Sequence, residues 1–177
     1  LTPKGYRITT HDAQDVVRKQ NTLDWTIEEA EKGGYPHFMI KEIMEQPEAI
    51  QNALRGRTIQ KDGMAKLGGL ERVEDRLKNI ERLMIVACGT AYYAGRVGEY
   101  MIEEHAGIPV ETDVASEFRY RKPVFRKGDA VLFISQSGET ADTLAALREA
   151  KQKGVLTLAI VNTVGSTLAR EVDAGIY

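Results

Sequence analysis

The sequence predicts an α/β domain with a parallel, doubly wound sheet, preceded by a short hairpin and a helical linker. Three observations carry this prediction. From residue 83 onward, short apolar runs alternate with segments of helical periodicity, a pattern that implies parallel strands joined by right-handed crossovers. The apolar runs are continuous, as in strands that are buried on both faces. With 177 residues, of which 42% are hydrophobic, the chain is long enough to bury one sizeable core.

The pattern of residues 1–36 predicts a peripheral segment rather than part of a hydrophobic core. Residues 6–10 alternate like a strand, residues 11–14 form a polar turn, and a second short strand begins at Val16. A lone hairpin is marginal in water, so we expect it to belong to a domain outside this chain. Two glycines and a proline interrupt residues 28–36, which predicts a linker.

Residues 37–80 predict connecting helices. Residues 38–44 are rich in apolar side chains, and Pro47 suits the first turn of a new helix. Two consecutive glycines at 68–69 break the helical pattern. A further apolar stripe at helical spacing then follows, formed by Leu70, Val73, Leu77 and Ile80.

Residues 81–177 predict the sheet itself. The expected strands are residues 83–87, 109–114, 130–134, 155–160 and 174–177. The helices between them are a first helix with Ala94, Val97, Met101, Ile102 and His105 on one face, a second over residues 140–153 closed by Gly154, and a short third over residues 166–171.

Composition and charge narrow the functional classes. The net charge of −2 is spread evenly, so neither half has the basic excess that binding to nucleic acid needs. The apolar runs are too short to span a membrane, and residues 1–5 lack signal-peptide character. The lone cysteine, Cys88, allows no intrachain disulfide and fits a reducing, cytoplasmic compartment. Leu1 in place of an initiating methionine indicates a piece of a longer chain.

Two loops at expected strand ends are candidate ligand sites, residues 88–91 and residues 135–140. In open parallel sheets, ligands bind outside the carboxyl ends of the strands. Each loop leads into a helix whose first N–H groups are unpaired and favour an anion. The second loop contains no Lys or Arg, but Gly138 permits close approach of a ligand. Its four side-chain donors for a phosphate are Ser135, Gln136, Ser137 and Thr140.

Helix capping is an alternative explanation of the same residues. Ser and Thr cap helices in many proteins, and residues 136–139 also fit a simple turn. The spacing alone does not decide between a phosphate cradle and plain capping. Two hydroxyl-bearing loops at two strand ends favour the cradle.

Other reactive residues have simpler explanations. Cys88 fits a small buried side chain better than a nucleophile, because no His is near it in sequence. The three His are scattered, so no metal site is expected. The cations of residues 119–127 are flanked by Glu117 and Asp129, which indicates a solvated loop rather than an anion site. Residues 89–98 hold no G-x-G-x-x-G motif of a dinucleotide site.

Three motifs around these loops resemble the isomerase part of the glutamine–fructose-6-phosphate amidotransferase family. They are ACGTAY at residues 87–92, VASEFRYR at 114–121 and SQSGETADT at 135–143. Residues 37–47, HFMIKEIMEQP, are similar to the segment that joins the two halves of that family, and NTVGS at 162–166 also matches. The resemblance covers nearly the whole chain.

The resemblance implies that different domains carry out different steps of the reaction. In that family, a glutaminase domain releases ammonia from glutamine, and two tandem sugar isomerase (SIS) domains convert fructose 6-phosphate into glucosamine 6-phosphate. Residues 1–36 would be the end of the glutaminase domain with a linker, 37–80 the connecting helices, and 81–177 most of the first SIS domain, which is doubly wound and flavodoxin-like. The parent protein would be a cytoplasmic homodimer that uses no cofactor.

The family pattern also assigns roles to the two loops. It implies that Thr90 contacts the sugar, with Ala91 beside it where the family often has Ser. The residues that it implies hold the sugar phosphate are Ser135, Gln136, Ser137 and Thr140. Tyr93 stands where a His is frequent, and no role is attached to it.

The family's catalytic groups cannot be placed on residues 1–177. The glutaminase nucleophile is an N-terminal Cys, whereas this chain has Leu1. The Lys that forms the sugar imine, and the Glu and His that move protons, belong to the second SIS domain and the C-terminal tail. We therefore expect a fragment that binds sugar phosphate weakly and does not turn it over.

Two other functions compete with this one. An SIS-type sugar-phosphate sensor would usually follow a helix-turn-helix, but residues 1–36 predict a hairpin and linker with balanced charge. A structural or dimerising module would not require polar groups to converge at a strand end.

Overall fold

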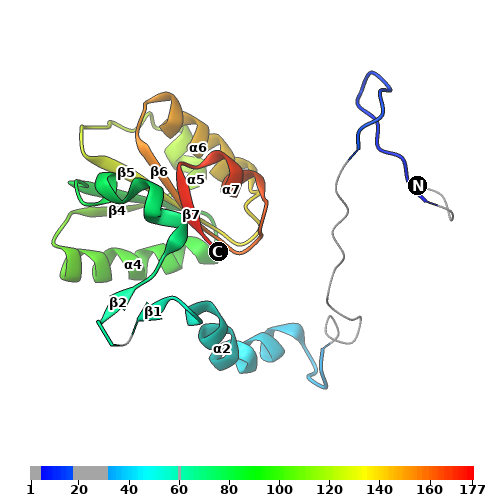
Figure 1. Ribbon diagram of the computed structural model, residues 1–177, viewed down its shortest axis with the longest axis horizontal. Helices are drawn as coiled ribbons and strands as arrows, with labels where there is room; N and C mark the ends of the chain where they lie inside the picture. Colours follow the sequence, from blue (N-terminus) through cyan, green and yellow to red (C-terminus); the bar gives the residue numbers. More distant parts are fainter. Residues whose placement is uncertain (1–4, 18–31, 60) are drawn as a thin grey trace. The chain divides into compact units, whose positions relative to one another are not determined.

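The computed structural model describes residues 5–17, 32–59 and 61–177. The chain divides into two compact units, Leu1–Arg55 and Gly56–Tyr177. The second unit contains the predicted sheet (Figure 1).

A five-stranded parallel sheet forms the centre of the second unit, with the strand order β4-β3-β5-β6-β7. The strands are β3 (Arg82–Ala87), β4 (Val110–Val114), β5 (Asp129–Ser135), β6 (Leu156–Val161) and β7 (Ala174–Ile176). All four pairings between neighbouring strands are parallel. The predicted fold class is therefore confirmed, and every predicted strand of the sheet is present.

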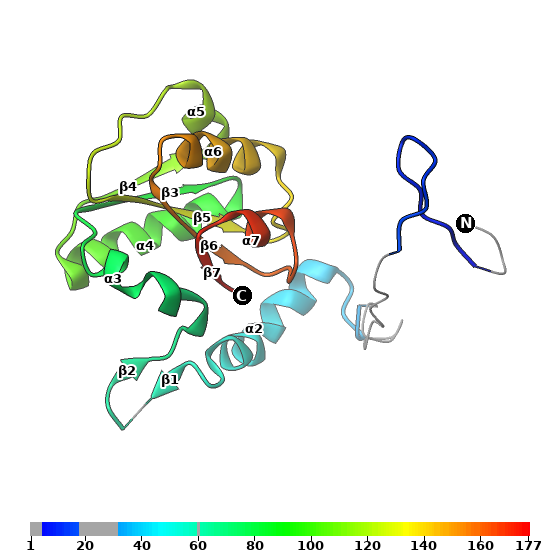
Figure 2. The same ribbon diagram turned by 45° about the horizontal axis from the view of Figure 1, so that its top comes forward.

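Helices cover both faces of this sheet, as Figure 2 shows. One face carries α4 (Thr90–Ala106), and the other carries α5 (Ala115–Tyr120), α6 (Ala141–Gln152) and α7 (Thr167–Glu171). Successive side chains of β3 point to opposite faces of the sheet and pack in two different hydrophobic clusters. Met84 and Val86 pack in the cluster beneath α5 and α6, whereas Leu83 and Ile85 pack in the cluster on the opposite face. Burial on both faces explains why this strand is a continuous apolar run.

The segment before the sheet differs from its prediction. A 3₁₀ helix, η1 (Gly68–Val73), is followed by the short α3 (Glu74–Leu77). The apolar stripe does face inward, because Val73 is buried and its three stripe partners pack against the same core. Gly69 does not break the helical pattern; a Cβ there would lie 1.8 Å from the carbonyl oxygen of Gly175 in β7. The glycine therefore permits close packing on the sheet edge.

Three short elements were not predicted. The strands β1 (Thr58–Ile59) and β2 (Met64–Ala65) form an antiparallel pair that is too short to show alternation in the sequence. Residues 119–120, expected in a solvated loop, end helix α5 instead. That helix is held by two buried side chains three residues apart, Ala115 and Phe118, which is too little apolar periodicity to predict a helix.

The buried face of α4 also differs from the predicted one. Val97 and Met101 are 60% and 55% exposed. The residue buried in this helix is Gly95, where a Cβ would lie 2.8 Å from the side chain of Ile85. The helix backbone packs closely on the sheet at Gly95. A prediction based on apolar side chains therefore missed the buried face.

The first unit contains the long helix α2 (Phe38–Leu54). The prediction that a separate helix starts near Pro47 is wrong, because this proline lies inside one continuous helix. Proline removes a single intrahelical hydrogen bond, and the Glu, Gln and Ala around it favour helix. No residue of α2 is buried.

The N-terminal hairpin has the predicted turn with little strand pairing. Thr9 and Asp15 form an isolated antiparallel bridge, and the N–H of Thr10 donates to the carbonyl of Gln14 at 2.8 Å. In the predicted linker, residues 28–31 lie outside the described residues. The N–H of Tyr35 donates to the carbonyl of Lys32 in a turn at its end.

Candidate functional site

The two predicted loops lie at the same edge of the sheet. β3 and β5 are adjacent and in register to their ends, with Ala87 paired to Ile134. The chain leaves β3 for one side of the sheet and returns to β5 on the other, so the strand order reverses between these strands. Ligands of open α/β sheets bind at such a switch point, outside the carboxyl ends of the strands. The fold therefore brings both loops to one candidate site.

The loop after β5 uses two serine side chains to fold on itself. The Oγ of the buried Ser135 accepts a hydrogen bond from the N–H of Gly138 at 3.0 Å. The exposed Ser137 accepts one from the N–H of Glu139 at 3.2 Å. In both cases the hydroxyl oxygen is the acceptor, so each O–H can still donate to a ligand. The turn and a ligand site are therefore compatible.

Thr140 begins helix α6 without capping it through its side chain. It is the N-cap residue, and its side chain makes no cap hydrogen bond. Thr140 as a whole is half-buried at the helix start, where unpaired N–H groups carry partial positive charge. Helix capping therefore explains none of these three side chains, whereas formation of the turn accounts for the hydrogen bonds that the two serines accept.

Gly138 fixes the shape of this loop. Its φ is +65°, a conformation that L side chains rarely adopt. A Cβ at this position would also lie 2.1 Å from the Oγ of Ser166 and 2.8 Å from Val161. The loop can pack against the end of β6 only because residue 138 has no side chain.

A second segment, residues 162–168, supports the loop from the side of β6. The hydroxyl of Thr163 donates to the carbonyl oxygen of Gln136 at 3.1 Å, and the N–H of Leu168 donates to the carbonyl of Gly138 at 3.0 Å. The N–H of Thr167 donates to the Glu139 carboxylate at 2.6 Å and lowers the pKa of that carboxyl. These contacts were not predictable from the sequence, because the two partners of each are more than twenty positions apart.

The loop after β3 contributes exposed groups. Gly89, with φ +59°, precedes helix α4 as its N-cap and makes no side-chain cap bond. Thr90 is exposed and Ala91 is half-buried at the first turn of this helix. The structure thus places all six predicted site residues at the same edge of the sheet, Thr90 and Ala91 at the start of α4 and the other four from the end of β5 to the start of α6.

Uncharged donors dominate this edge. Arg119 of α5 lies near the start of α6, but its guanidinium is paired with Asp142 at 2.8 Å. Arg121, from the cationic run, is paired with Asp113 at 2.9 Å. Both arginines therefore form ion pairs within the domain and supply no free cation to the two loops. An anion at the loops would depend on hydroxyls, amides and helix N-termini.

The remaining candidate residues do not form a reactive site. Cys88 is half-buried and packs against the core, with its Sγ 4.0 Å from the hydroxyl of Thr143. The described residues contain no cluster of His, Cys, Asp and Glu suited to a metal ion. Over the same ranges, no helix has the length and apolar character needed to cross a bilayer.

Known proteins similar to this chain share both its sequence and its fold. Residues 76–177 match the family model of the SIS domain. Over all 177 residues, the chain is 51% identical to glutamine–fructose-6-phosphate aminotransferase [isomerizing] of Chlorobaculum tepidum, and it spans 29% of that protein. It is 58% identical over 155 residues, 88% of this chain, to the protein of the same name from Caldanaerobacter subterraneus, and there it spans 25%.

A solved structure agrees with this similarity. The C-terminal domain of glucosamine-fructose-6-phosphate aminotransferase from Francisella tularensis superposes with a TM-score of 0.75 at 41% identity. The alignment covers 82% of this chain and 40% of that one. The chain therefore spans less than a third of the curated relatives and less than half of this structural neighbour.

Proposed function

This chain belongs to the SIS domain family, and from that premise we propose that it is the sugar-phosphate-binding part of an enzyme that makes glucosamine 6-phosphate. The substrates of that enzyme are fructose 6-phosphate and glutamine. The phosphate is held by Ser135, Gln136, Ser137 and Thr140, and the sugar lies beside Thr90 and Ala91.

The observation that carries this proposal is the hydroxyl-rich loop at the switch point of the sheet. Ser135 and Ser137 accept N–H groups and keep an O–H to donate, and Thr140 has an uncommitted hydroxyl. The first N–H groups of α6 add a favourable field for an anion. A phosphate monoester needs several donors arranged around one end, and this loop supplies them without a cationic side chain.

The role of such a cradle in catalysis is to position the sugar. Fixing the phosphate end of a hexose sets the distance between its reacting carbons and the groups that act on them. We place those groups outside residues 1–177, in a second SIS domain and tail. On this proposal the chain binds substrate but forms no glucosamine 6-phosphate by itself.

We also propose the domain division that the resemblance implies. Residues 1–36 would be the end of a glutaminase domain with its linker, 37–80 connecting helices, and 81–177 most of the first SIS domain. The names and lengths of the relatives support this division, since their proteins are more than three times as long as this chain.

The cradle is tested by titrating fructose 6-phosphate into the isotope-labelled 177-residue chain and following amide NMR signals. We expect shifts at residues 135–140, which a Ser137→Ala/Thr140→Val variant reduces because two donors are lost. Thr58→Val is the matched control, because it removes an exposed hydroxyl of β1 far from the loops in sequence. Shifts that avoid residues 135–140, or that both variants reduce equally, would discard the cradle.

A further inference from the structure

A hollow lies at the opposite end of the sheet from the hydroxyl loop. Its volume is about 1000 Å³, and it is lined where β5 and β6 begin, by residues 125–129 and 153–156. Arg76 and residues 78–81 form the third wall. All of these segments belong to the second unit. The size is that of cavities which hold small-molecule ligands. The proposed function makes no use of this hollow.

The residues that line this hollow carry a net positive charge, whereas the whole chain is net negative. Two carboxylates, Glu81 and Asp129, are among the lining residues. The lining cations number five, namely Arg76, Lys78, Arg126, Lys127 and Lys153. A net positive lining on a chain of net charge −2 concentrates anions locally.

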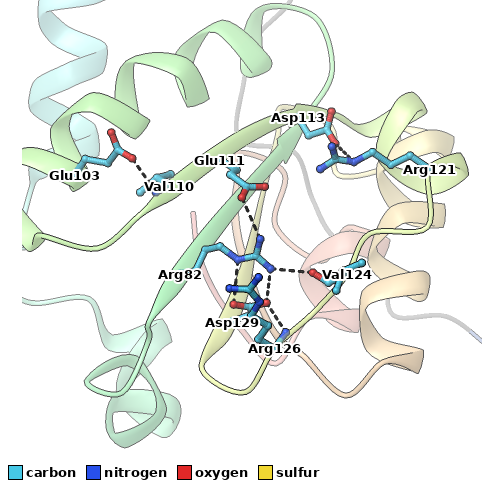
Figure 3. A network of polar contacts seen from close by, with 9 residues as sticks. All are labelled: Arg82, Glu103, Val110, Glu111, Asp113, Arg121, Val124, Arg126 and Asp129. Atoms are coloured by element: carbon cyan, nitrogen blue, oxygen red, sulfur yellow. Dashed lines mark hydrogen bonds and ion pairs between the residues drawn. The ribbon is translucent and has the colours of Figure 1, made fainter.

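One of the two carboxylates is already neutralised from outside the hollow. The side chain of Asp129 is 2% exposed and lies 2.5 Å from the guanidinium of Arg82, which is not a lining residue. The backbone N–H of Arg126 also donates to it at 2.6 Å, as Figure 3 shows. Arg82 is therefore the main partner of Asp129, which also attracts Arg126 more weakly, and Glu81 is the other opposing charge.

The lining cations are available to a ligand. Among the described residues, the side chains of Arg126 and Lys127 form no hydrogen bond and no ion pair within 4 Å, and Arg126 is attracted only at longer range by Asp129. Lys78 is paired with Glu74 at 2.7 Å, but both side chains are more than 60% exposed, and such pairs exchange readily for another anion. Arg76 and Lys153 lie 3.7 and 4.0 Å from their carboxylates, which are long contacts.

An anion in this hollow would be held by side chains and not by backbone N–H groups. Helix α6 ends at this edge with its partial negative charge, so the backbone does not attract an anion as it does at the opposite edge. Beyond Arg126 and Lys127, the three other lining cations are held only by long or exposed carboxylate contacts, which a more highly charged anion can replace. We propose that this hollow binds a small polyanion with two or more phosphate groups, held by Arg126 and Lys127 and ringed by the other three cations.

Pyrophosphate is the probe that tests this site on the 177-residue chain, by calorimetry and amide NMR. We expect shifts at Lys127, Gly128 and Gly154, which line the hollow. Arg126→Gln/Lys127→Gln should raise the Kd about tenfold, because two charge-assisted contacts are lost. Lys61→Gln/Lys66→Gln makes the same change of charge on residues outside the lining and should leave the Kd unchanged.

Three outcomes would overturn the site. The first is that pyrophosphate shifts amide signals only outside the lining residues, and the second is that both double variants raise the Kd equally. The third is that the chain binds poly-glutamate but does not respond to pyrophosphate. The test is independent of the proposed function, because Ser137→Ala/Thr140→Val should leave the pyrophosphate shifts intact. Loss of the fructose 6-phosphate response alone would discard the cradle and not this site.

Discussion

Thr163 supports the β5 loop through one side-chain hydrogen bond, from its hydroxyl to the carbonyl of Gln136 at 3.1 Å. Thr163→Val removes the donor at nearly constant volume. A hydrogen bond of this kind contributes about 1 kcal/mol. We therefore expect the Kd for fructose 6-phosphate to rise about fivefold, measured by calorimetry.

The conservative change separates positioning from a general loss of structure. Thr163→Ser keeps the hydroxyl and should restore the affinity to within about twofold of the wild type. Equal weakening by the valine and serine variants would contradict a positioning role. A fall in the unfolding temperature of Thr163→Val alone would point to stability instead.

Asp129 has a buried carboxylate that is bound from two sides. Burial raises the pKa of this carboxyl, but hydrogen bonds from Arg82 and from the N–H of Arg126 outweigh that effect and lower the pKa below its usual 3.8. Asp129→Asn leaves the guanidinium of Arg82 without its closest partner. We expect the free energy of unfolding at pH 7 to fall by about 3 kcal/mol, measured by urea titration.

The pH dependence of this loss has a definite sign. A carboxyl with a lowered pKa stabilises the folded state fully above its ordinary pKa and less as the pH falls through the folded value. The gap between wild type and Asp129→Asn should thus stay constant from pH 7 to about 5 and shrink below about 4. The exposed pair of Arg148 and Glu171 is the control, and Glu171→Gln should cost less than about 1 kcal/mol.

The position of a candidate site residue was predictable where it depends only on neighbouring residues in the sequence. The hydroxyls of Ser135, Ser137 and Thr140 follow a strand in the sequence, and a strand end is where ligands bind. The bond from Thr163 to Gln136 and the ion pair of Arg82 with Asp129 join residues 27 and 47 positions apart. Such partners follow from the strand order, which one sequence does not specify.

Elements were predictable where burial is continuous. The strands β3 and β5 are apolar between their end residues, and β6 is apolar except at Thr157, because both faces of the sheet are covered. Their positions are therefore plain in the sequence. Helix α5 is only six residues long, and the strands β1 and β2 have two residues each. Segments this short lack the periodicity from which a prediction is made.

Gly69 and Gly68 allow a matched test of how η1 packs on β7. A Cβ at Gly69 would lie 1.8 Å from the carbonyl oxygen of Gly175, whereas at Gly68 the nearest group is the end of a Glu71 side chain at 3.7 Å. Gly69→Ala should lower the free energy of unfolding by about 1–3 kcal/mol because backbone must move apart. Gly68→Ala should change it by less than about 0.5 kcal/mol. Equal effects in denaturant titrations would refute the close contact.

The two proposed anion sites lie at opposite ends of one sheet in the second unit and differ in their donors. At the carboxyl ends, helix N-termini and hydroxyls supply neutral donors, and at the amino ends only cationic side chains are available. Salt should therefore weaken the two sites differently. We expect pyrophosphate affinity to fall more steeply than fructose 6-phosphate affinity when NaCl is raised from 50 to about 200 mM, because exposed charges are screened.

The second unit also contains its own core, which predicts that it folds without the first. Among the residues that the structure describes, the buried apolar ones begin at Val73, and no residue of α2 is buried. A chain of residues 56–177 should unfold within a few degrees of the full chain and keep its amide response to fructose 6-phosphate. A chain of residues 76–177 keeps only the segment that matches the SIS family and loses η1.

That shorter chain exposes the core cluster that Leu70 and Val73 cover, at a cost of several kcal/mol. Its unfolding temperature should therefore fall by more than about 10 °C in a calorimetric scan. If both truncated chains unfolded at the same temperature, η1 would not be part of the folded unit. If the chain of residues 56–177 failed to fold, the stability of the sheet would depend on residues 1–55.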